Sequence, residues 1–64
     1  MSIGSNVKKY RTIRGLSQRE LALITGVANS TISDIERDTK NPSVKLLDKL
    51  TKALHCKRED LVRE

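Results

Sequence analysis

Two amphipathic segments joined by a very short turn constrain this chain more than any other feature. Gly26 ends one helical segment and the next begins at Asn29, so only two residues separate them. Helices joined this tightly must cross at a steep angle. The crossing needs a small side chain at the contact, a turn residue that tolerates positive φ, and a branched apolar residue on the second helix. Ala22, Gly26 and Ile32 meet these needs in turn, which predicts two short helices folded sharply against each other.

Local signals divide the rest of the chain into further helices. Apolar residues recur at helical spacing in five segments, at about residues 3–14, 17–25, 29–37, 43–54 and 58–63. Serines stand where the first, second and fourth segments begin, and a serine side chain there can accept a hydrogen bond from a free backbone amide. The second start, Ser17-Gln18-Arg19-Glu20, has the spacing of a reciprocal capping box. Ala28 precedes the third segment and offers no such cap.

The absence of strand patterns fixes the expected fold class. No segment alternates apolar and polar residues for long enough to indicate a strand. We therefore predict an all-α fold, a compact bundle of five short helices, and one domain over residues 1–64. We expect Leu61 and Val62 of the last helix to join the core, and Gly4 to weaken the first helix slightly. The apolar face of the fourth segment is expected to complete the core through Leu46, Leu47, Leu50 and Leu54.

Composition argues against several classes of protein. The chain carries 13 Lys and Arg against 8 Asp and Glu, a net charge of +5, and a single cysteine that cannot form an internal disulfide. Its longest apolar run has four residues, far short of the roughly 20 that cross a bilayer, and no signal peptide is recognisable. His55 and Cys56 stand apart from other metal ligands, and no catalytic triad or phosphate-binding glycine loop is recognisable. We expect a non-enzymatic cytoplasmic protein without metal or cofactor.

The order and spacing of these signals resemble the lambda-repressor-like helix-turn-helix family, also described as the xenobiotic-response-element or phage repressor type. The resemblance covers essentially the whole chain. It is carried by Val7, Arg11, Gly15-Leu16-Ser17-Gln18, Glu20-Leu21-Ala22, Gly26-Val27, Ser30-Thr31-Ile32-Ser33, Ile35-Glu36, Asn41-Pro42-Ser43, Leu47 and Ala53-Leu54.

The resemblance implies sequence-specific binding of double-stranded operator DNA, typically by a phage or bacterial transcriptional repressor. The third helix, about Asn29–Arg37, would enter the major groove, and dimers would read two half-sites. Amide, hydroxyl and carboxylate groups can all bond base edges there. The expected base contacts are Asn29, Ser30, Ser33 and Asp34. For Asp34, a simple ion pair with Arg37 on the helix surface is an equal alternative.

Contacts to the DNA backbone are expected around this helix. Helix N-termini carry free amides that attract phosphate, and the family uses the position of Gln18 in this way. The expected phosphate contacts are Gln18, Arg11, Arg37, Lys40, Asn41, Ser43 and Val44. The family often joins two positions near the backbone in a partly buried ion pair, and we expect Arg11 to pair with Glu36 here. Ser17 and Ser43 would also act as ordinary caps.

Some residues depart from the family pattern. Ala28 replaces the usual Ser or Thr cap, Asp38 stands where Gly is common, and the last helix is polar where family dimers often have an apolar patch. Homodimerisation is therefore expected to be weak in isolation, or to depend on DNA or on residues beyond Glu64. An antitoxin-type regulator with an unknown protein partner remains an alternative, as does a helix-turn-helix module used only for protein interaction. A membrane-surface role for Lys45, Lys49 and Lys52 conflicts with the core's need for the leucines of that helix.

Overall fold

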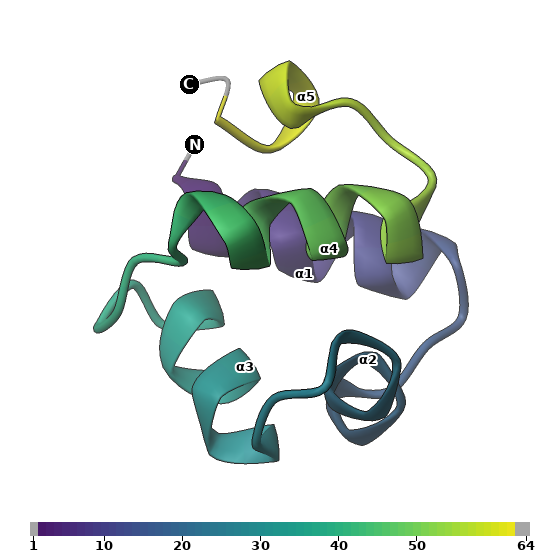
Figure 1. Cartoon of the computed structure of the whole chain (residues 1–64). Coiled ribbons are helices and arrows are strands. Elements are labelled where there is room, and N and C mark those ends of the chain that lie inside the picture. Colours follow the sequence, from purple (N-terminus) through teal and green to yellow (C-terminus); the bar gives the residue numbers. More distant parts are fainter. Residues whose placement is uncertain (1, 63–64) are drawn as a thin grey trace.

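The computed structural model describes residues 2–62, which form five α-helices (Figure 1). In chain order the helices are α1 (Ile3–Ile13), α2 (Gln18–Thr25), α3 (Asn29–Glu36), α4 (Val44–Leu54) and α5 (Arg58–Val62). The predicted all-α bundle is confirmed. In the view of Figure 1, α1 and α4 occupy the middle, α5 lies above them, and α2 and α3 lie below. The predicted end of the last helix at Arg63 falls outside the described residues.

Side-chain caps start three of the helices. Ser2 and Ser5 form a reciprocal capping box at α1, and Ser17 and Glu20 form another at α2. At α4 the Ser43 hydroxyl accepts from the Leu46 amide at 3.1 Å. The start of α3 is different, because Ala28 makes no side-chain cap. These starts agree with the sequence pattern, while α1 and α3 end one residue earlier than predicted.

The core gathers one face of every helix. Thr25 is buried with it and donates to the Leu21 carbonyl at 2.8 Å. Asn6 is also buried, and its side-chain amide donates to the Leu61 carbonyl of α5 at 2.8 Å. These bonds let polar groups lie inside without an unsatisfied atom. The buried apolar residues are Val7, Leu21, Ala22, Ile32, Ile35, Leu47, Leu50, Leu54 and Leu61.

One expectation about an individual residue was wrong, and another was incomplete. Val62 is 44% exposed, because Leu61 takes the inward position of the short α5 and its neighbour turns outward. Gly4 does more than weaken α1: it is buried, and a Cβ added there would lie 2.2 Å from the Ile35 carbonyl oxygen. The missing side chain thus allows the first turn of α1 to touch the last turn of α3.

The turn between α1 and α2 sets the direction of α2. Gly15 adopts φ +70° after α1, and the Leu16 amide donates to the Arg11 carbonyl at 3.0 Å. A residue in the left-handed region, followed by an amide that bonds back to the last turn, is a common C-terminal cap of an α-helix. Gly15 therefore has the capping role expected for it. No helix in the described part of the chain is long and apolar enough to cross a membrane.

Candidate nucleic-acid interface

The joint between α2 and α3 has the geometry that its sequence requires. Gly26 adopts φ +75°, a left-handed conformation that favours glycine. The amides of Gly26 and Val27 both donate to the Ala22 carbonyl, at 2.8 and 3.1 Å. Ala22 and Ile32 are buried on either side of the turn. The short turn therefore directs α3 away from the end of α2, below α4 in the view of Figure 1.

This placement divides α3 into an apolar and a polar side. Ile32 and Ile35 are fully enclosed by the core. Asn29 and Ser30, at the beginning of α3, are exposed, while Ser33 and Asp34 are half-buried. We call these four polar residues the α3 face. The α3 face presents one amide, two hydroxyl groups and one carboxylate, which between them can donate to and accept from base edges.

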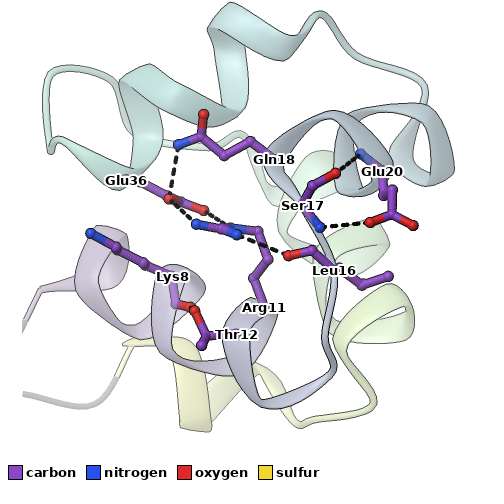
Figure 2. Close-up of polar contacts among 8 residues, drawn as sticks. All are labelled: Lys8, Arg11, Thr12, Leu16, Ser17, Gln18, Glu20 and Glu36. Carbon is purple, nitrogen blue, oxygen red and sulfur yellow. Dashed lines mark hydrogen bonds and ion pairs between the residues drawn. The ribbon is translucent and has the colours of Figure 1, made fainter.

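A polar network holds α3 against α1 and α2 (Figure 2). Arg11 donates through Nε to Glu36 Oε2 at 2.6 Å and through a terminal nitrogen to Glu36 Oε1 at 3.1 Å. Its other terminal nitrogen donates to the Leu16 carbonyl at 2.8 Å. Gln18 donates to Glu36 Oε1 at 3.1 Å. The predicted pairing of Arg11 with Glu36 is confirmed, and the participation of Gln18 in it was not foreseen.

Burial makes this network important for stability. The side chain of Glu36 is only 3% exposed and that of Arg11 14%. A carboxylate removed from water requires charged or polar partners, and its two-pronged bond to a guanidinium is among the strongest available. The hydrogen bond to Glu36 is also the main reason that the pKa of Arg11 is raised above its ordinary value. Arg11 therefore stays charged at every physiological pH.

Asp34 and Arg37 form a second ion pair, this time at the surface. Arg37 donates to Asp34 Oδ1 at 2.5 Å, and the two side chains are 34% and 66% exposed for Asp34 and Arg37 respectively. This is the pairing that the sequence left open for Asp34. An exposed pair one turn apart on a helix contributes ~0.5 kcal/mol or less. Either partner can accordingly exchange this contact for a ligand at little energetic cost.

The starts of α2 and α4 offer backbone amides to an anion. The Ser17 hydroxyl accepts from the Glu20 amide at 3.0 Å, and the Ser43 hydroxyl accepts from the Leu46 amide. Each cap engages an amide one turn inside the helix, so the earlier amides, including those of Gln18 and Val44, point out of the helix start.

The first turn of α4 contains no acidic residue. Lys40 and Asn41 are exposed in the loop that leads to it.

Other chemistry finds little support in the described residues. No group of three His, Cys, Asp or Glu side chains among residues 2–62 could hold a metal ion. Cys56 is half-buried and packs against the core, and burial raises the pKa of its thiol. A raised pKa keeps a thiol protonated and poorly nucleophilic. His55 ends α4 with φ +53°, in the helix-end position expected for it.

Comparison with known proteins agrees with this geometry. A family model described as Helix-turn-helix matches residues 7–61, which is most of the chain. The chain belongs to the helix-turn-helix family. This helix-turn-helix chain is 41% identical over 63 residues to SinR, an HTH-type transcriptional regulator of Bacillus subtilis. The match covers 97% of this chain and 57% of SinR, so the chain spans little more than half of that relative.

Solved structures extend the likeness to the arrangement of helices. The P22 c2 repressor in complex with a synthetic operator has a TM-score of 0.94 at 30% identity, covering 98% of this chain and 96% of that one. SinR in complex with DNA has a TM-score of 0.87 at 42% identity, covering 92% of this chain and 95% of that one. The lambda-repressor-like fold implied by the sequence is thereby confirmed.

Proposed function

We propose that residues 1–64 form a single domain that binds double-stranded operator DNA sequence-specifically. This domain is a transcriptional repressor or the DNA-binding part of one. The observation that carries the proposal is the α3 face: small polar side chains lie outward on a helix whose opposite side is locked into the core. The two relatives solved with operator or DNA add support. The domain acts by binding rather than by catalysis, in the cytoplasm.

In this proposal α3 enters the major groove and the α3 face makes the base contacts. Asn29 bonds adenine through its amide, and Ser30 and Ser33 bond whichever base edges they reach. Asp34 accepts from cytosine after releasing Arg37, which then turns to a phosphate. Releasing that exposed pair costs little free energy. Asp34 and Arg37 thus bind each other in the free domain and bind DNA in the complex.

Phosphates on either side of the groove bind the flanking helix starts. Gln18 and Val44 donate their backbone amides, and the Ser43 hydroxyl, Lys40 and Asn41 add contacts beside α4. Arg11 acts chiefly by orienting α3 through Glu36, and the part of its guanidinium that remains exposed meets the nearest phosphate. The domain binds as a homodimer that forms on DNA, with half-sites about 10 base pairs apart.

The alternative of a module used only for protein interaction makes a different demand on α3. Such a module would place apolar side chains on the outward side of the helix, whereas the α3 face is entirely polar. The large exposed apolar residues of the described chain lie outside α3, and Leu23 and Ile24 of α2 are among them. A protein partner could contact these residues in addition to DNA, as the antitoxin-type alternative requires.

Selection of bound sequences from a random DNA pool, followed by titration against salt, tests the proposal. We expect a palindrome with half-sites about 10 base pairs apart, and an affinity that falls linearly with salt on logarithmic axes. Lys40→Ala should reduce that salt slope by about one. Lys57→Ala removes the same charge from the loop before α5 and should leave the slope unchanged. Recovery of random sequences from the pool would contradict the proposal.

A further inference from the structure

The residue that follows α3 by two positions reaches back to the start of α1. Asp38 adopts φ +62°, and its carboxylate accepts from the Ser2 hydroxyl at 2.7 Å and from the Gly4 amide at 3.2 Å. Residues with side chains rarely adopt a positive φ, although aspartate tolerates it better than most. Glycine would make the same turn without strain but has no carboxylate with which to contact α1.

Gly4 brings the two helices together at this point. A Cβ on residue 4 would lie 2.2 Å from the Ile35 carbonyl oxygen and 2.9 Å from that of Glu36. The backbone of α1 therefore rests directly on the end of α3, and the Asp38 carboxylate closes over the same contact. We call the Asp38 contacts to Ser2 and Gly4 the Asp38 clamp.

Among residues 2–62, the Asp38 clamp adds to another polar attachment between the end of α3 and α1. This other attachment is the ion pair of Arg11 with Glu36. Arg11 lies seven residues after Gly4, so the two attachment points on α1 are about 10 Å apart along the helix axis. Ile32 and Ile35 already pack α3 into the core. Two polar attachments at separated points of α1 restrict the direction of the end of α3 more than one attachment would.

We propose that Asp38 is a positioning residue for base recognition: the Asp38 clamp fixes the direction of α3 on α1 and thereby the placement of the α3 face. The effect on base recognition rests on the proposed function, while the fixing of α3 does not. Asp38 itself makes no base contact in this scheme. A carboxylate near a helix N-terminus is also a favourable cap for α1, so the test must separate positioning from capping.

Three variants of the 64-residue chain make that separation. Asp38→Gly accepts the positive φ but removes the carboxylate. Asp38→Asn removes only the charge, because its amide oxygen can still accept from the Gly4 amide and its nitrogen can donate to the Ser2 hydroxyl. Asp60→Asn is the matched control: the Asp60 carboxylate accepts from the Lys57 amide at 2.9 Å at the start of α5, away from α3.

Residual dipolar couplings give the first readout, the direction of α3 relative to α1 in solution. We expect Asp38→Gly to lower the order of α3 against α1, and Asp38→Asn and Asp60→Asn to match the parent chain. A pure cap would lower thermal stability without changing these couplings. Unchanged couplings in Asp38→Gly would therefore overturn the proposal, whatever its melting temperature.

The second readout is the ratio of affinities for selected and random DNA, measured well below every melting transition. Asp38→Gly should lower this ratio about tenfold, the effect of losing one base contact, and Asp38→Asn should stay within about twofold. A ratio for Asp38→Gly equal to that of Asp60→Asn would contradict positioning for base recognition. If the parent chain prefers no sequence, the proposed function fails, and the couplings alone still decide whether Asp38 fixes α3.

Discussion

The two ends of α3 are held in very different ways. At its beginning Ala28 provides no side-chain cap, and Asn29 and Ser30 lie exposed beside it. At its end the buried carboxylate of Glu36 is bound by Arg11, and Asp38 reaches back to α1. A free helix start keeps its amides available to a ligand, while a fixed end sets where those amides point. In this eight-residue helix, the backbone amides at the start remain available to a ligand, while the end is held firmly against α1.

The largest effect is expected when the ion pair that holds the end of α3 is removed. Arg11→Ala should lower the free energy of unfolding by about 3 kcal/mol, because it leaves the Glu36 carboxylate buried without a charged partner. Urea unfolding measures the loss. The double variant with Glu36→Ala should recover part of it, since the unpaired charge is gone. Losses that add within about 0.5 kcal/mol would show that the two residues are not coupled.

A smaller disturbance of the same end comes from the contact at Gly4. Gly4→Ala should lower the free energy of unfolding by about 2 kcal/mol, because the new Cβ must push the end of α3 away from α1. Lys8→Ala, on the exposed side of α1, is the control and should stay within about 0.5 kcal/mol of the parent chain. Thermal unfolding of both variants measures the difference. A Gly4→Ala variant as stable as Lys8→Ala would contradict the close contact between α1 and α3.

The free end can instead be strengthened. Ala28 has the extended backbone of an N-cap residue, with φ −69° and ψ 149°, but no side-chain oxygen. Ala28→Ser should therefore raise the free energy of unfolding by about 1 kcal/mol. Urea unfolding at neutral pH is the measurement. A lowered stability would mean that the start of α3 is already satisfied in another way.

The smallest expected effect is at α2, whose capped start contrasts with that of α3. The hydrogen bonds from the Ser17 backbone and side chain lower the pKa of Glu20 below its ordinary value. A depressed pKa in the folded state means that Glu20 adds stability above its unfolded pKa and loses it as the pH falls through the folded value. Thermal melts from pH 6 to pH 3 should therefore fall less steeply in Glu20→Gln. Parallel curves would assign the acid sensitivity to other carboxylates.

Local signals in the sequence predicted the parts of the fold that depend on neighbouring residues. The capping box at Ser17, the left-handed turns at Gly15 and Gly26 and the leucines of α4 each depend on residues within about one or two turns, so periodicity and spacing reveal them. The Arg11 pairing with Glu36 joins residues 25 apart and came from the family resemblance rather than from local physics.

The contacts that sequence reasoning missed are those made at long range by ordinary-looking residues. Gly4 reads as a weak point in a helix, and only the approach of the α3 carbonyls shows why a side chain is excluded. Asp38 reads as a departure from a glycine, although it bonds to a residue 36 positions away. Val62 sits beside Leu61 in the sequence, and the direction of the short α5 decided which of the two is buried. Only Asp38 carried a signal, as an aspartate where a glycine was expected.

The role of the free end is tested most directly by repeating the DNA selection with Asn29→Ala and Ser30→Ala. Both residues are exposed at the start of α3, so stability should change by less than about 1 kcal/mol. Each variant should still bind DNA but lose its preference at one or two positions of each half-site, at a cost of about 1–3 kcal/mol per position. A selected sequence identical to that of the parent chain in both variants would contradict base recognition by α3.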